Sequence, residues 1–236
     1  MIWYSYKGIP YTGNCPAYYD LSSKIWFADL KNNQVIIKSL VLDYLNQEGI
    51  EVEKYFNTEL VAGKESWKVS PFVFWTKRNE KNISRAKDLF SLFQNIPGLT
   101  GLAISILPAQ TSVNPHYGDT DAVYRIHIPI KIPAALPGCG LKVSGIEKSW
   151  EQNGLLAFCD AHLHEAWNHS NETRIVLIAD VLREDYLMEQ KNICLNVLSL
   201  LQLQQLTNKH KWINSFPAEG KGILRIILKT VLFIKS

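Results

Sequence analysis

The stretch Asn114–Ile130, NPHYGDTDAVYRIHIPI, decides the fold because it places two histidines and an arginine in and just before an apolar strand. Arg125 and His127 are two residues apart and therefore share one face of the predicted strand, while three isoleucines share the other face. Burying a guanidinium or an imidazole costs free energy unless the group has a partner. The pattern therefore predicts a β core whose inner face holds a polar ligand.

Further strands are predicted on both sides of this stretch, between about residues 100 and 183. Short runs rich in Ile, Val and Leu alternate with turn residues such as Pro137-Gly138 and Ser144-Gly145. This arrangement is typical of a sandwich or a barrel. The runs are LAISILPAQTSV, VYRIHIPIKIP, GLKVSG, GLLAFCD and TRIVLIADVL.

The flanking segments have helical spacing of their apolar residues. Residues 32–49 and 83–98 each predict a helix, and Ser84 is a candidate N-cap of the second one. Helical spacing returns after Arg183. We therefore expect one domain over residues 1–236. It would have a helical or mixed N-terminal part (1–100), a β core (about 100–183) and a helical C-terminal tail (184–236).

Composition and charge are those of an ordinary soluble globular protein. The chain has 236 residues, 47% hydrophobic and 20% charged, and its net charge of +3 gives no reason to expect nucleic-acid binding. No secretory signal is visible at the start of the chain, and four cysteines without CxxC spacing indicate reduced thiols, so we expect a cytoplasmic location. The apolar stretch 223–234 is too short to span a bilayer and contains Arg225 and Lys229; packing on the core is favoured over a membrane-surface helix.

A second polar group lies in FCDAHLHEAWNHSNETRIVLIADV, residues 158–181, where three histidines precede an apolar strand. Two regions of the predicted β core thus each supply a histidine followed by an arginine. Arg125 follows His116 by nine residues, and Arg174 follows His164 by ten. Imidazoles suit Fe(II), and arginine takes a carboxylate with paired hydrogen bonds. Two histidines on a metal and arginines deeper in the barrel would hold 2-oxoglutarate from both ends, although a strand histidine is often only a packing residue.

The segments 115–133 and 154–183, with Trp150 between them, resemble the aspartyl/asparaginyl β-hydroxylase family. The shared features are a Pro-His-x-Gly turn, an Arg-x-His strand, a Trp before a Gly-rich turn, a Phe-x-Asp strand, a His-Glu-x-Trp element and an Arg that opens the last strand. They cover about a third of the chain. The resemblance implies a mainly β fold with flanking helices, a double-stranded β-helix (cupin-like jelly roll), forming a single oxygenase domain.

The resemblance also implies the cofactors and the site. It implies Fe(II), 2-oxoglutarate as cosubstrate and O2, with His116 and His164 as the metal ligands and catalytic residues. It implies cosubstrate contacts from Arg125, His127, Arg174 and Ser105, and a place for Trp75 in the pocket wall. The expected reaction is hydroxylation of an unactivated carbon of an amino acid, a small peptide or a related small metabolite.

Gly118 leaves the reaction type open. Most enzymes of this chemistry have a carboxylate two residues after the first histidine, and this chain has glycine there. Asp119 and Asp121 lack the usual spacing, so we assign neither to the metal. One alternative is a halogenase, in which chloride occupies the coordination position that Gly118 leaves open. Another is a non-catalytic jelly roll that binds a small carboxylate. We expect no nucleic-acid partner and no membrane span, and the oligomeric state is not readable from the sequence.

Overall fold

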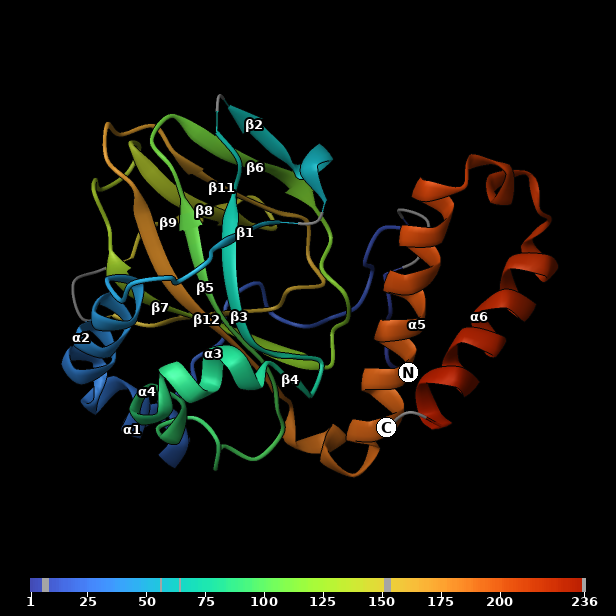
Figure 1. Ribbon diagram of the computed structural model, residues 1–236, viewed down its shortest axis with the longest axis horizontal. Helices are drawn as coiled ribbons and strands as arrows, with labels where there is room; N and C mark the ends of the chain where they lie inside the picture. Colours follow the sequence, from blue (N-terminus) through green and yellow to red (C-terminus); the bar gives the residue numbers. More distant parts are fainter. Residues whose placement is uncertain (6–8, 56, 64, 151–153, 235–236) are drawn as a thin grey trace.

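The computed structural model describes residues 1–5, 9–55, 57–63, 65–150 and 154–234. Two antiparallel sheets form the centre of the molecule, and helices lie on its outside (Figure 1). The sheets pack face to face, because one apolar cluster contains side chains from both, such as Val113, Leu141, Phe158 and Val176.

The larger sheet has seven strands in the order β1-β3-β5-β12-β7-β10, and β4 pairs with the free end of β3. Its strands are β1 (Glu53–Lys54), β3 (Lys68–Phe74), β4 (Lys77–Arg78), β5 (Leu99–Leu107), β7 (Val123–Lys131), β10 (Leu156–Phe158) and β12 (Arg174–Leu182). The smaller sheet has the order β2-β6-β11-β8-β9. Its strands are β2 (Val61–Gly63), β6 (Thr111–His116), β8 (Cys139–Val143), β9 (Ile146–Lys148) and β11 (His164–Asn168).

The connectivity of the eight strands from β5 to β12 defines the fold. The chain passes from one sheet to the other at almost every step, and each sheet receives four of these strands, in the orders β5-β12-β7-β10 and β6-β11-β8-β9. Two four-stranded antiparallel sheets connected in this way form a jelly roll. The predicted double-stranded β-helix with flanking helices is therefore confirmed.

Helices cover the outer face of the larger sheet (Figure 1). They are α1 (Ile25–Asn32), α2 (Gln34–Leu45), α3 (Glu80–Arg85) and α4 (Lys87–Ser91); a short 3-10 turn, η1, spans Thr58–Leu60. Ile37 and Val41 of α2 share an apolar cluster with Ile126 and Ile128 of β7. The isoleucines of β7 thus lie under the helices, which leaves the opposite face of the strand, with Arg125 and His127, to the barrel interior.

Three local features differ from the sequence prediction or add to it. The helix predicted over 83–98 begins earlier and is interrupted at Ala86, and its N-cap is Asn79, whose side chain accepts from the Asn82 N–H at 3.1 Å, rather than Ser84. The N-terminal part contributes strands β1 and β3 to the larger sheet. No strand was predicted where β11 lies.

The C-terminal segment forms a helical hairpin on the side of the barrel away from α1 and α2 (Figure 1). It consists of η2 (Glu184–Glu189), α5 (Gln190–Lys209), η3 (Lys211–Ser215) and α6 (Ala218–Ile234). Val197 and Leu198 of α5 share an apolar cluster with Trp75 and Val123 of the barrel. α6 packs on α5, and among its described residues only Leu232 is buried. No helix of the described chain is long and apolar enough to cross a membrane.

Candidate functional site

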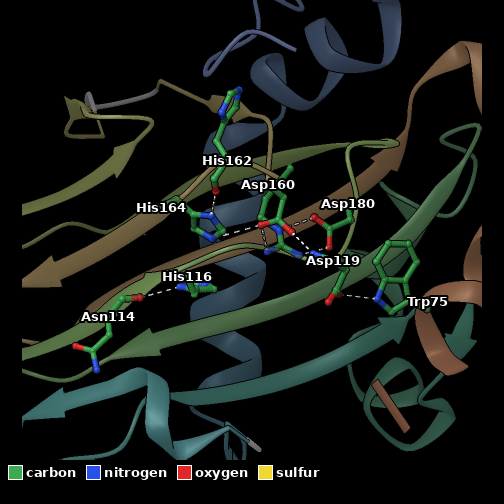
Figure 2. A network of polar contacts seen from close by, with 9 residues as sticks. Trp75, Asn114, His116, Asp119, Asp160, His162, His164 and Asp180 are labelled. Atoms are coloured by element: carbon green, nitrogen blue, oxygen red, sulfur yellow. Dashed lines mark hydrogen bonds and ion pairs between the residues drawn. The ribbon is translucent and has the colours of Figure 1, made fainter. Parts of the chain in front are cut away.

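Two histidines from the smaller sheet face each other inside the barrel. His116 ends β6 and His164 begins β11, and the antiparallel register of these strands places the two residues directly opposite each other. Their ring centroids are 4.1 Å apart. Figure 2 shows both side chains pointing into the same space. Strand pairing therefore brings together the two predicted metal ligands, which lie far apart in the sequence.

Backbone carbonyls fix the orientation of both rings. His116 Nδ1 lies 2.8 Å from the carbonyl O of Asn114, and His164 Nδ1 lies 2.8 Å from the carbonyl O of His162. Since a carbonyl only accepts, each Nδ1 carries the proton and donates it. The lone pair is then on Nε2 of each ring, which is how metal-binding histidines are commonly oriented.

The environment keeps both imidazoles neutral. Burial, reinforced by the neighbouring His164, lowers the pKa of His116 to about 3. Burial is also the main cause that lowers the pKa of His164 to about 4, and the charge of Arg125 adds to it. Neutral imidazole is the form that binds a metal ion. The pair is therefore ready to coordinate at neutral pH without first losing protons.

A carboxylate lies beside the histidine pair. It comes from a different part of the chain than the position two residues after His116, where most enzymes of this chemistry have their carboxylate. Asp160, which follows β10, is 1% exposed, and its Oδ1 lies 3.4 Å from His164 Nε2. Its Oδ2 accepts from the backbone N–H of Asp119 at 3.2 Å. A Cβ at Gly118 would collide with this carboxylate and approach the Asp160 carbonyl oxygen to 2.6 Å. Residue 118 is glycine, then, because Asp160 occupies the adjoining space.

Arg125 is tied to two carboxylates. Its Nε and Nη2 donate to the two oxygens of Asp180, both at 2.8 Å, and its Nη1 donates to Asp160 Oδ1. Burial alone would lower the pKa of Arg125, but the charges of Asp160 and Asp180 raise it well above its usual range. Arg125 thereby holds Asp160 in place; that it also contacts a cosubstrate stays a prediction.

A second polar cluster lies deeper, around Arg174 at the start of β12. Arg174 is 2% exposed, its Nη2 donates to Ser105 Oγ at 3.1 Å, and its guanidinium lies 5.2 Å from the ring centre of Trp150. The ring of His127 is nearly parallel to that of Trp150, with 5.9 Å between their centroids. Trp67 Nε1 also donates to Ser105 Oγ, at 2.9 Å. The structure thus brings together three of the residues predicted to bind a cosubstrate.

This cluster has unsatisfied polar atoms. None of the described residues supplies a hydrogen-bond partner to Arg174 Nε, His127 Nδ1 or Trp150 Nε1, although all three atoms are buried. Burial lowers the pKa of Arg174 only to about 10, so it stays charged at pH 7; burial and the Arg174 charge lower the pKa of His127 well below its usual range. Buried polar atoms are normally paired, so these atoms indicate a ligand. A carboxylate fits a buried guanidinium best.

The donor set fits Fe(II) and 2-oxoglutarate. No group of three or more His, Cys, Asp and Glu in the described residues is arranged to hold a metal ion, so the chain itself offers the two neutral histidines. Fe(II) accepts imidazole nitrogens and leaves its other positions to oxygen ligands. His116 and His164 would hold the metal, and Arg174 would receive the far carboxylate of the cosubstrate.

The other predicted or considered residues lie at the edge of this site. Asp119 Oδ2 accepts from Trp75 Nε1 at 3.1 Å (Figure 2). Burial and the charge of Asp160 raise the pKa of Asp119 to about 7. Asp121 accepts from the backbone N–H of Trp3 at 2.8 Å. Both aspartates therefore have structural partners outside the histidine pair.

A cavity of about 400 Å³ borders Asp119 on the side of the C-terminal hairpin. Much of its wall is apolar and belongs to α5. The lining residues include Ser5, Val197, Leu200, Leu201, Leu203 and Gln204. Polar side chains, among them Thr207, Asn214 and Lys221, complete the wall. Since the Asp119 N–H contacts the Asp160 carboxylate, this cavity lies next to the wall of the site.

Comparison with known proteins places this geometry in context. The profile of the aspartyl/asparaginyl beta-hydroxylase family matches residues 31–184. The chain is similar to an ornithine lipid ester-linked acyl 2-hydroxylase of Rhizobium tropici, with 28% identity over 174 residues, covering 72% of this chain and 62% of that protein. It is also similar to the human aspartyl/asparaginyl beta-hydroxylase, with 30% identity over 140 residues, covering 56% of this chain and 18% of that protein.

Among solved structures, the chain is similar to an oxidoreductase of the 2OG-Fe(II) oxygenase family from Burkholderia pseudomallei. The TM-score is 0.42 and the sequence identity 15%, and the match covers 72% of this chain and 84% of that one. The chain spans less than two thirds of the length of either curated relative.

Proposed function

The chain belongs to the aspartyl/asparaginyl beta-hydroxylase family, and from this membership and the geometry of the site we propose that it is an Fe(II)/2-oxoglutarate-dependent hydroxylase. One observation carries the proposal. Two neutral histidines, whose Nδ1 atoms donate to backbone carbonyls and whose Nε2 atoms carry the lone pair, share the barrel interior with a buried arginine whose Nε has no partner among the described residues. The two histidines would bind the metal, and the arginine would bind the far carboxylate of the cosubstrate.

In this mechanism the chain binds and orients the metal and the cosubstrate, and it excludes water from them. His116 and His164 would hold Fe(II), and Arg174 with Ser105 would fix the far carboxylate of 2-oxoglutarate. Arg174 and His127 are 2% and 5% exposed, so the cosubstrate would be bound out of water. When bound, Fe(II) with 2-oxoglutarate and O2 would supply the oxidation of a C–H bond to C–OH, with 2-oxoglutarate converted to succinate and CO2.

Asp160 favours hydroxylation over halogenation. A halogenase needs an anion to occupy the position that Gly118 leaves open, but the Asp160 carboxylate borders that space and is fixed there by Arg125. A second negative ion would have to approach a buried carboxylate, at a considerable electrostatic cost. Product formed with excess chloride and bromide should therefore contain added oxygen and no halogen by mass spectrometry.

The test of the proposed site uses metal-free protein under anaerobic conditions. Adding Fe(II) and 2-oxoglutarate should give the visible charge-transfer band of the chelated metal, and His116→Ala and His164→Ala should lose it. His169→Ala is the matched control, because His169 lies just after β11, with its ring near Ser112, and should retain the band. A band that survives in folded His164→Ala would contradict the ligand assignment. A folded wild type without any band would instead support the non-catalytic carboxylate-binding alternative.

For the substrate we propose an amino acid, a small peptide or a related small metabolite, as the sequence suggested. The human relative is named for hydroxylation of aspartyl and asparaginyl residues. Incubation with amino acids and short peptides should then couple succinate formation to a product heavier by one oxygen atom.

A second candidate substrate is an acyl chain, and the cavity beside Asp119 favours it. This space of about 400 Å³ has four apolar side chains of α5 in its wall, Val197, Leu200, Leu201 and Leu203. The Rhizobium relative is named for hydroxylation of an ester-linked acyl chain of a lipid. Leu200→Trp would narrow the cavity, so it should slow turnover of an acyl substrate and leave the charge-transfer band unchanged. Equal turnover in Leu200→Trp and wild type would favour the small amino-acid substrate.

A further inference from the structure

Most apolar side chains of helix α6 face outward, whereas a helix that packs on a protein core turns its apolar side chains inward. Five aliphatic side chains are exposed by between 44% and 77%: Ile223, Ile226, Ile227, Val231 and Ile234. Their spacing of three, four and seven residues places them on one side of the helix. We call these five residues the outer face of α6. A large contiguous apolar patch exposed on a protein marks a site that binds another protein, a membrane or a ligand.

The opposite side of α6 carries cations and faces α5. Arg225 donates to Ser199 Oγ at 3.5 Å and to Asn196 Oδ1 at 3.3 Å, and Lys229 Nζ donates to Asn192 Oδ1 at 2.7 Å. Leu232, the one buried residue among the described part of the helix, lies on this side as well. The sequence had favoured packing of residues 223–234 on the core, but the structure turns most of their apolar surface outward.

The segment that presents this face is also strongly basic. From Lys209 to the end of the chain there are six Lys and Arg residues and one carboxylate, Glu219, so the rest of the chain has a small negative balance. Lys209 and Lys211 are exposed at the turn of the hairpin. Trp212 and Phe216, in the same turn, are 63% and 38% exposed. Aromatic and aliphatic side chains next to lysines are the composition of helices that lie in a membrane interface.

We propose that the outer face of α6, with Trp212 and Phe216, docks on a lipid bilayer that carries anionic headgroups. The aliphatic side chains would enter the acyl region, and the exposed Lys209 and Lys211 would contact the headgroups. A second copy of the chain suits the surface less well. A twofold interface would place the same cationic segment against itself, and like charges would oppose the contact.

This surface lies outside the proposed metal site, so the inference goes beyond the proposed function and does not depend on it. The histidine pair belongs to the smaller sheet, whereas α6 is attached to the barrel through α5 (Figure 1). Binding to lipid can therefore be measured on the protein whether or not it turns over a substrate.

The experiment is sedimentation with large vesicles of phosphatidylcholine, with and without about a quarter phosphatidylglycerol. Wild type should sediment with the anionic vesicles and should be released as salt rises and the Debye length shortens. The double variant Ile226→Glu/Ile227→Glu should lower the bound-to-free ratio at least about tenfold. The control is Ile36→Glu, because Ile36 on α2 is exposed by 53%, the same fraction as Ile227, and lies away from the hairpin. Ile36→Glu should bind as wild type does.

Three outcomes would overturn the proposal. The first is wild-type protein that stays in solution with anionic vesicles at low salt. The second is equal loss of binding in Ile36→Glu and in the α6 variant. The third is a wild-type dimer in light scattering that becomes a monomer in Ile226→Glu/Ile227→Glu, which would assign the outer face to a second copy. A Lys209→Glu/Lys211→Glu variant, which leaves the apolar face intact, should lose the preference for anionic over neutral vesicles.

Discussion

Replacing Gly118 by alanine tests the relation between Gly118 and Asp160 with a single methyl group. The alanine Cβ would collide with the Asp160 carboxylate and would approach the Asp160 carbonyl oxygen to 2.6 Å. Gly118 also donates its backbone N–H to that carbonyl at 2.8 Å, so the backbone cannot move away without losing this bond. We expect the side chain of Asp160 to be displaced.

The magnitude follows from what Asp160 holds. Overpacking a well-packed site by a methyl group costs about 1–3 kcal/mol, and breaking a buried ion pair costs about 3–5 kcal/mol. Arg125 would keep its paired hydrogen bonds to Asp180, so the second cost applies only in part. Gly118→Ala should therefore lower the free energy of unfolding of the metal-free protein by roughly 2–4 kcal/mol.

The assay is urea unfolding of the metal-free protein, with Gly222→Ala as control. Gly222 lies in α6 with no atom near its Cβ position, and alanine there should raise stability slightly. The same Gly118→Ala change in an Asp160→Ala background should cost less, because the colliding carboxylate is gone. A cost below about 0.5 kcal/mol, or an equal cost in both backgrounds, would refute the packing argument.

Three further predictions concern the deep polar cluster and the histidines. Arg174→Met should weaken 2-oxoglutarate binding by roughly 30- to 1000-fold in calorimetry with the metal present, and Arg174→Lys by roughly tenfold, because lysine keeps the charge but loses the fork geometry. Trp150→Phe keeps an aromatic ring but removes the buried Nε1–H, which has no hydrogen-bond partner among the described residues and would donate to the cosubstrate, so it should weaken the same binding by roughly three- to tenfold. The third is pH dependence: the folded pKa of His164 is about 4 and the unfolded value about 6.5, so the unfolded chain takes up a proton that the folded one does not. This term should lower stability by up to about 3 kcal/mol as pH falls from 6.5 to 4. The raised pKa of Asp119 makes its contribution to stability change with pH in the opposite direction. The urea measurement therefore compares the pH dependence of stability in wild type and His164→Gln. Parallel pH profiles of the two proteins would contradict the contribution assigned to His164.

Much of the β core could be predicted because its strands alternate in a readable way. In β7 the apolar residues face the helices and the polar ones face the interior, so periodicity alone indicated the inner face. β11 was missed for the opposite reason. Its buried positions are His164, Ala166 and Asn168, so burial alternates along the strand while hydrophobicity does not. A strand whose inward residues are functional or hydrogen-bonded has no apolar pattern to detect.

The partners of Arg125 could not be predicted, because they depend on strand register. Arg125 lies opposite Asp180 only because β7 and β12 pair antiparallel at that register, and Asp160 reaches it from the loop after β10. The spacing rule for a metal carboxylate looks two residues after the first histidine, where this chain has glycine. The structure supplies a carboxylate near the same place from a residue far along the chain, which no local motif encodes.

The charges of the site explain why it would bind both a cation and a dianion, with the cation at one end and the carboxylate of the dianion at the other. Arg125 is outweighed by Asp160 and Asp180, so the end of the site near the two neutral histidines has an excess negative charge, to which Asp119, with a pKa of about 7, adds a further part. Arg174 contributes one positive charge at the other end. A divalent cation is therefore attracted to the histidine end and a carboxylate to Arg174. Because Fe(II) and 2-oxoglutarate carry opposite charges of equal size, the loaded site has the same net charge as the protein alone, and neither ligand would leave a buried charge without compensation.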